Sequence, residues 1–149
     1  MSPRILPLLL ASAAIAYACG PRSHASESPA RRQKDAEGGV AASLNVTVKD
    51  EVQLALRVTN GEPKRIELRF PNGQTHDFVV LDTTGREIWK WSESRLFTQS
   101  MQSRVLERDE TVTFASSWDP GDRRGTYVAQ VSLRSDNHPV EKSVRFDIP

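Results

Sequence analysis

The chain has 149 residues, of which 20 are Lys or Arg and 19 are Asp or Glu, so its formal net charge is +1. Proteins that bind nucleic acid usually carry a strong excess of basic side chains, and this balance gives no support to such a function. The single cysteine, Cys19, cannot form an internal disulfide, so the folded part must be stabilised by its hydrophobic core alone.

The first 18 residues have the pattern of a signal peptide. Arg4 precedes an apolar run over residues 5–18, which is too short to span a bilayer. Small residues, Ala16 and Ala18, lie just before Cys19, where a signal peptidase would cleave. Two interpretations remain open: a secreted soluble protein, or a lipoprotein whose Cys19 is acylated after cleavage. We favour the lipoprotein, because the only cysteine occupies this position.

Residues 19–42 are predicted to be the lipidated cysteine followed by a disordered linker. Ser, Ala, Gly, Pro and mixed charges dominate this segment, which cannot bury enough surface to offset the entropy of ordering. We therefore expect a protein anchored in the bacterial cell envelope through acylated Cys19. Gly20 favours the outer membrane in a host that has one, since the inner-membrane retention signal places Asp there.

The remaining residues, 43–149, are enough for one domain with a single hydrophobic core. Short apolar alternations recur along it, without a long helical pattern. Strands are expected around residues 46–48, 52–58, 66–70, 77–81, 89–91, 105–106, 112–114, 127–133 and 144–148. Eight or nine short strands with short connections predict an all-β antiparallel sandwich.

One segment, residues 71–99, has more than generic β-protein character. It contains the strings PNGQTHDFVVLD, GREIWKWS and FTQ. These strings resemble the core motif of the BsuPI family of bacterial intracellular proteinase inhibitor domains, in which Tyr is usual at the position of His76. The resemblance extends to Trp118 and to the Gly-Thr-Tyr string at 125–127, so it covers most of the domain.

The resemblance implies an immunoglobulin-like sandwich. The family more often has Gly in the turn at 107–110, so Asp109 is expected to adopt positive φ, which Asp tolerates better than most residues. Trp89 and Trp91 are interpreted as core residues rather than an exposed binding patch. The residues that match the motif are expected to be structural; they are Gly73, Gln74, Asp77, Phe78, Asp82, Trp89, Trp91, Phe97, Thr98 and Gln99.

Residues 43–149 offer few groups for catalysis. They contain no cysteine, no G-x-S-x-G string and no Cys/His metal spacing. His76 adjoins Asp77, but sequence neighbours on a strand point to opposite faces, so His76 is expected to be a packing or surface residue. Asp119 and Asp122 flank a glycine, yet two carboxylates are too few for a calcium site. We predict no enzymatic activity, no cofactor and no metal.

Two functions remain open. The family implies a proteinase inhibitor, with residues 92–104 as the contact loop and Arg95, Leu96 and Phe97 able to enter the specificity pocket of a serine protease. The predicted leader places such a target in the envelope or outside the cell. The alternative is a non-inhibitory envelope module that binds another protein or a glycan through its loops or a sheet edge. An ordered, protruding loop with Leu96 or Phe97 exposed favours inhibition, whereas burial of both favours a structural role.

Overall fold

The computed structural model describes residues 36–37 and 39–149. The predicted signal peptide and Cys19 lie outside the described residues. The described part consists of ten strands and one short 3-10 helix, η1 (Trp91–Ser94). The strands are β1 (Ala36–Glu37), β2 (Val40–Val48), β3 (Val52–Asn60), β4 (Ile66–Phe70), β5 (His76–Leu81), β6 (Glu87–Lys90), β7 (Gln102–Leu106), β8 (Thr111–Trp118), β9 (Gly125–Leu133) and β10 (Val140–Ile148).

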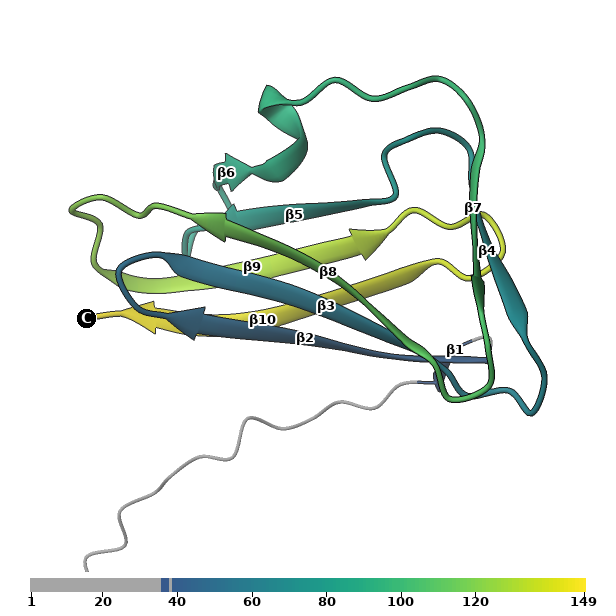
Figure 1. Ribbon diagram of the computed structural model, residues 1–149. Coiled ribbons are helices and arrows are strands. Elements are labelled where there is room, and N and C mark those ends of the chain that lie inside the picture. Colours follow the sequence, from purple (N-terminus) through teal and green to yellow (C-terminus); the bar gives the residue numbers. More distant parts are fainter. Residues whose placement is uncertain (1–35, 38) are drawn as a thin grey trace, which may run out of the picture. The chain divides into compact units, whose positions relative to one another are not determined.

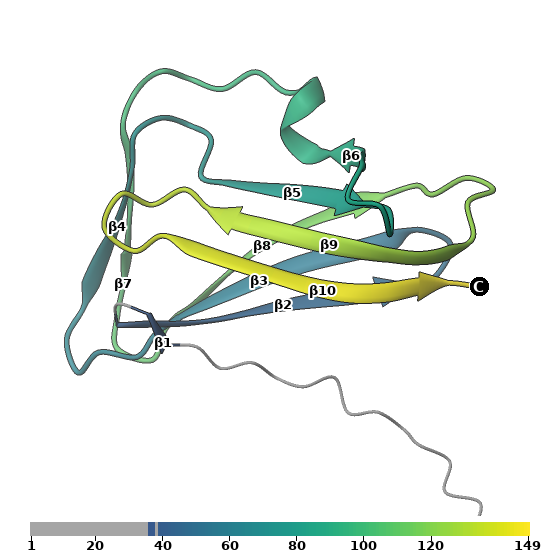
Figure 2. The same ribbon diagram turned by 180° about the vertical axis from the view of Figure 1, so that it is seen from behind.

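Two four-stranded antiparallel sheets form the layers of the sandwich, in the strand orders β1-β2-β3-β8 and β10-β9-β5-β6. A third sheet, made of β4 and β7, stands across one end of these layers (Figure 1; Figure 2). The all-β sandwich predicted from the sequence is therefore confirmed.

The core lies between the sheets and follows from the period-two alternation of the strands. In β3 the burial alternates residue by residue, and its inward side chains Val52, Leu54, Leu56 and Val58 are almost completely buried. Burying one such side chain stabilises the fold by about 1.5–3 kcal/mol. Phe78 and Val80 of β5 fill the opposite layer in the same way. None of the described residues is a cysteine, so this packing replaces the disulfide of antibody domains.

The folded region begins earlier than the predicted start at residue 43. Strand β2 opens at Val40, which is 1% exposed and pairs with Asn60 of β3. Ala41 and Ser43, on the outward face of β2, are small, so the sequence does not show a clear alternation of apolar and polar residues here. Pairing with β3 establishes which residues of β2 are buried. Residues 36–37 form β1 within the segment predicted to be linker, so the described part has ten strands where eight or nine were predicted.

Two turns are fixed by polar residues. Asp109, in the turn between β7 and β8, has φ 60°, as predicted. The buried side chain of Asn60 connects this turn to the turn after β3. Its Nδ2 donates to the carbonyl oxygens of Lys64 at 2.8 Å, Leu106 at 3.1 Å and Glu107 at 3.1 Å.

No helix in the described part of the chain is long and apolar enough to cross a membrane.

Candidate functional site

The predicted contact loop connects β6 to β7. It begins with the 3-10 helix η1, continues through residues 95–101 without regular structure, and ends where β7 starts at Gln102. In Figure 1 this connection runs from η1 above β5 to the end sheet that β4 and β7 form. The predicted irregular segment 92–104 is thus shorter than expected, because η1 and β7 occupy its two ends.

Trp91 forms the base of this loop. One face of its ring stacks on His76 of β5, with 4.3 Å between the ring centroids. The guanidinium carbon of Arg95 lies 4.5 Å from the centroid of the Trp91 ring, within the range of a cation–π contact. The Phe97 ring lies 5.5 Å from Trp91 in a tilted arrangement. Residues on both sides of Leu96 are therefore packed against one indole.

Asp77 holds η1 against β5. Its carboxylate accepts hydrogen bonds from the backbone N–H of Ser92 at 3.1 Å, the Ser92 hydroxyl at 2.6 Å and the Gln74 side-chain amide at 3.2 Å. These bonds are charge-assisted, and a buried carboxylate needs such partners. Asp77 is thus a structural acceptor, on the opposite face of β5 from His76.

The far side of the loop is attached at Thr98. The backbone N–H of Gly73 donates to the Thr98 carbonyl oxygen at 2.9 Å. A side chain at position 73 would place its Cβ 2.7 Å from the Thr98 hydroxyl oxygen, so this close approach requires glycine. The PNGQ and FTQ strings, separated by more than 20 residues, are therefore in direct contact.

The side chains between these attachments differ sharply in exposure. Leu96 is 102% exposed, whereas Phe97 is half-buried against Trp91. Beneath the loop lies a groove of about 490 Å³, lined by Phe70, Gly73, Thr75, Leu96, Phe97, Thr98, Gln102, Ser103, Arg104 and Phe114. Between its contacts with Trp91 and Gly73, the loop therefore presents Leu96 to solvent; Met101, beyond Thr98, is also exposed.

A family model described as intracellular proteinase inhibitor, BsuPI, matches residues 40–138. The chain belongs to the BsuPI family. No curated protein matches it. The matched region of the BsuPI domain begins at Val40, the residue at which β2 begins.

Solved structures that are similar to this BsuPI domain belong to much larger proteins. A β-glucuronidase from Bacteroides uniformis aligns over 74% of this chain and 13% of its own, with 14% identity and a TM-score of 0.38. An alkylpurine DNA glycosylase from Pseudomonas fluorescens, bound to DNA containing an abasic site analogue, aligns over 74% of this chain and 30% of its own. Its identity is 12% and its TM-score 0.41. Similarity at this level does not extend to function, and neither activity is carried over to this chain.

The other motif residues of the BsuPI domain also make contacts within the fold. Trp89 stacks near Trp118, with ring centroids 6.4 Å apart, and Phe78 is completely buried. Asp82 closes the turn between β5 and β6 by accepting from Thr84 and Arg86. The hydrogen bond from the Thr84 hydroxyl is the main reason that the pKa of Asp82 lies below its ordinary value. The exposed Gln99 side chain donates to the Phe97 carbonyl oxygen at 3.4 Å.

His76 is buried in an aromatic environment. Its ring contacts Phe78 at 5.3 Å and Phe114 at 4.9 Å in addition to Trp91, and its Nε2 is buried without a hydrogen-bond partner. Burial, with a smaller contribution from Arg95, lowers the pKa of His76 to about 4, while Asp77 acts in the opposite direction. The imidazole is therefore neutral at pH 7 and packs as an aromatic ring, and its burial removes it from any substrate.

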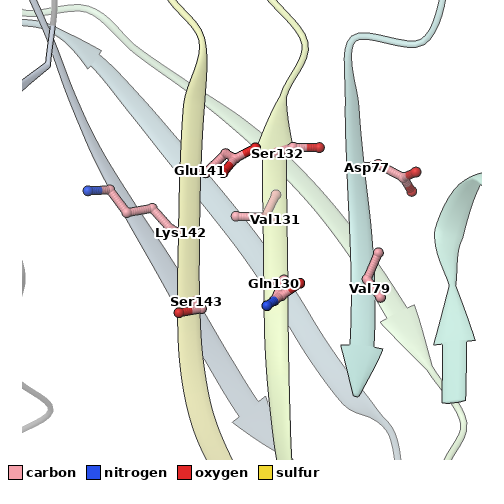
Figure 3. Close-up of a pocket in the computed structure, with 8 residues that line it drawn as sticks. All are labelled: Asp77, Val79, Gln130, Val131, Ser132, Glu141, Lys142 and Ser143. Atoms are coloured by element: carbon pink, nitrogen blue, oxygen red, sulfur yellow. The ribbon is translucent and has the colours of Figure 1, made fainter. Parts of the chain in front are cut away.

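A second hollow, of about 330 Å³, lies along β5, β9 and β10 (Figure 3). Its eight lining residues are Asp77, Val79, Gln130, Val131, Ser132, Glu141, Lys142 and Ser143. They include serines but neither histidine nor cysteine, and the Asp77 carboxylate is already bonded to Ser92 and Gln74. Across residues 36–37 and 39–149, no group of three or more His, Cys, Asp or Glu could hold a metal ion.

Two residues of the site were missed by the sequence analysis. Ser92 supplies the hydrogen bonds that fix η1, and its only signal was its place directly after Trp91 in the motif string. Phe114 of β8 contacts His76 and lines the groove beneath the loop. Nothing local in the sequence indicates that Phe114 belongs to the site, because only the fold brings β8 of one sheet close to β5 of the other.

Proposed function

We propose that this BsuPI domain inhibits a serine protease by presenting residues 95–97 to its active-site cleft, without catalysing a reaction itself. The observation that carries the proposal is the full exposure of Leu96 on a loop whose neighbouring residues are packed against Trp91. An attached loop loses little conformational entropy on binding, which favours affinity. Family membership supports the same function.

We further propose that the inhibitor acts outside the cytoplasm, anchored to the envelope through acylated Cys19. The apolar run that ends in Ala18-Cys19 supports this location, and it implies a different target from the intracellular one in the family's description. Labelling of growing cells with a fatty-acid analogue tests it. The wild-type protein is expected to be labelled and to sediment with membranes, whereas Cys19→Ser is expected to do neither; an unlabelled wild type would refute the anchor.

The inhibitor function is tested by titrating the purified protein against a panel of serine proteases while residual activity is measured. Stoichiometric inhibition of at least one enzyme is the expected result. The panel should include subtilisin-type and chymotrypsin-type enzymes, since the exposed side chain is apolar. No inhibition at concentrations well above micromolar would reject the proposal.

A second candidate function is binding of a partner along the edge of β7. Strand β7 pairs only with β4 among the described strands, and Val105 on it is 48% exposed. The far edge of β4, by contrast, is covered by backbone and side-chain hydrogen bonds from Asp136 and Asn137. An open edge can accept an extended segment of another protein. Ser103 lies opposite Arg69, whose backbone groups bond to Asp136 and Asn137, so the Ser103 N–H faces the open edge of β7. Ser103→Pro would remove this donor, and loss of partner binding with inhibition retained would favour this function.

A further inference from the structure

Three consecutive side chains of the loop point in alternating directions. Arg95 has φ −123° and ψ 147°, which is extended backbone. In an extended chain, residues i and i+2 project to one side and residue i+1 to the other. Arg95 and Phe97 both contact the Trp91 ring, whereas Leu96 between them is 102% exposed, so its side chain points to solvent.

The segments on both sides of Leu96 are attached to the body of the domain by independent contacts. On the amino-terminal side, Trp91 stacks on buried His76 and Ser92 is bonded to Asp77. On the carboxyl-terminal side, the Thr98 carbonyl accepts from Gly73. A protease that binds Leu96 would therefore meet a segment that is already held on both sides.

We propose that Leu96 is the specificity residue of this inhibitor and that its partner is a serine protease with an apolar specificity pocket. This inference rests on the inhibitor function proposed above. Arg95 offers the only basic side chain in the triplet, but its guanidinium carbon lies 4.5 Å from the centroid of the Trp91 ring, a contact that Arg95 would have to give up to enter a pocket. A partner with an acidic specificity pocket, which selects Arg or Lys, is therefore not the natural target.

The same geometry allows reversible cleavage of the bond between Leu96 and Phe97. The protease serine Oγ attacks the Leu96 carbonyl carbon while the protease histidine accepts the serine proton. The C–N bond to Phe97 then breaks, and the histidine transfers that proton to the Phe97 nitrogen. The products are an ester between Leu96 and the protease serine and a free amine on Phe97, so every atom and proton is accounted for.

Retention of the Phe97 amine is what turns a substrate into an inhibitor. The Phe97 ring rests on Trp91, and the next residue, Thr98, is bonded to Gly73. The amine therefore stays beside the ester and attacks it faster than water does, because an intramolecular nucleophile has a high effective concentration. The peptide bond is re-formed, and the protease remains occupied.

Substitution of Leu96 tests the inference on the full protein. Leu96→Ala is expected to weaken inhibition of subtilisin-type and chymotrypsin-type enzymes about 10- to 100-fold, since most of the side chain that the protease pocket would bury is lost. Leu96→Arg is expected to transfer inhibition to trypsin, whose pocket carries a carboxylate. Met101→Ala, also in an exposed part of the loop at 72%, is the matched control and is expected to leave inhibition unchanged.

The outcomes separate this inference from the function on which it rests. If the wild type inhibits a protease and both Leu96 variants inhibit it equally well, the specificity residue is wrong and the inhibitor function stands. If neither the wild type nor Leu96→Arg inhibits any enzyme of the panel, both proposals fail. Mass spectrometry of long incubations is expected to find one cut, between Leu96 and Phe97, in a form that still inhibits. Rapid cutting with loss of inhibition would make the loop a substrate and overturn the inference.

Discussion

The carboxylate of Asp77 on β5 accepts two hydrogen bonds from one residue, Ser92 of η1: its backbone N–H at 3.1 Å and its hydroxyl at 2.6 Å. Asp77 is only 5% exposed, so these bonds satisfy a charge that burial would otherwise destabilise. Because Ser92 directly follows Trp91, these hydrogen bonds also hold the start of the loop against β5.

Removal of the Ser92 hydroxyl should therefore destabilise the domain. Hydrogen bonds to charged groups contribute about 1.5–3 kcal/mol, so we expect Ser92→Ala to lower the free energy of unfolding by about 2 kcal/mol. Ser94→Ala, in the same short helix but exposed, is the control and should change stability by less than about 0.5 kcal/mol. Urea denaturation of the two variants measures the difference, and equal stabilities would show that the hydrogen bond from the Ser92 hydroxyl to Asp77 contributes nothing.

The contact between Gly73 and Thr98 predicts a second sensitive position. A Cβ at residue 73 would lie 2.7 Å from the Thr98 hydroxyl oxygen and 3.1 Å from the Thr98 nitrogen. We expect Gly73→Ala to lower the free energy of unfolding by about 1–3 kcal/mol, as overpacked positions do. It should also make the loop easier to cleave by proteases that do not recognise Leu96.

Gly61→Ala is the matched control for that substitution. Its Cβ would meet nothing nearer than 3.6 Å, which is ordinary van der Waals contact. Thermal unfolding of both variants, together with limited proteolysis, compares the two sites. A Gly73→Ala protein as stable and as resistant as Gly61→Ala would contradict the close approach of residue 73 to Thr98.

The strands were predictable because their signal is local. Alternation in residues 52–58 and 127–133 places β3 and β9 correctly, and the glycine-free turn at 107–110 identified Asp109 as the residue with positive φ. Val40 was missed because Ala41 and Ser43 on the outward face of β2 are small. Val40 is buried because β2 pairs with β3, and the sequence of β2 alone does not show this pairing.

The site was less predictable, since its contacts join residues distant in sequence. The motif strings indicated which residues would matter, but not that Gly73 contacts Thr98 or that Trp91 contacts both His76 and Arg95. From the sequence, Arg95, Leu96 and Phe97 were all candidates for the protease contact, with exposure of Leu96 or Phe97 as the deciding feature. The three-dimensional arrangement leaves Leu96 exposed and packs Phe97 against the indole.

Acid should destabilise the domain through His76. Its pKa of about 4 in the folded protein is below the ordinary value of 6.5, so the folded state favours the neutral ring. The corresponding stability is complete above pH 6.5 and is lost as the pH falls toward 4. We expect the free energy of unfolding to decrease by about 2 kcal/mol between pH 7.5 and 5.

His76→Tyr, which introduces the residue usual in the family, is the matched variant for this effect. Tyr does not titrate in this range, so the variant should lose little stability between the same two pH values. Asp77 and Arg95, the charged groups that act on His76, remain in place in both proteins. Chemical denaturation of the wild type and the variant at about pH 7.5 and about pH 5 gives the four free energies of unfolding to be compared. An equal loss of stability in wild type and variant would assign the acid sensitivity to other groups.

Asn60 should be the most sensitive polar residue of the end that carries β4 and β7. Its side chain is completely buried, donates to the carbonyl oxygens of Lys64, Leu106 and Glu107, and accepts from the backbone N–H of Glu62 at 2.9 Å. Asn60→Ala leaves these buried groups without partners, so we expect a loss of about 3 kcal/mol in the free energy of unfolding.

Two further variants determine whether the donated hydrogen bonds are responsible. Asn60→Asp keeps an oxygen for the Glu62 N–H but places a second oxygen against three carbonyl oxygens, so it should be at least as destabilising as Asn60→Ala. Asn45→Ala, at an exposed position of β2, should change the free energy of unfolding by less than about 0.5 kcal/mol. Urea denaturation ranks the three proteins, and an Asn60→Asp protein as stable as Asn45→Ala would exclude the donor role of Asn60.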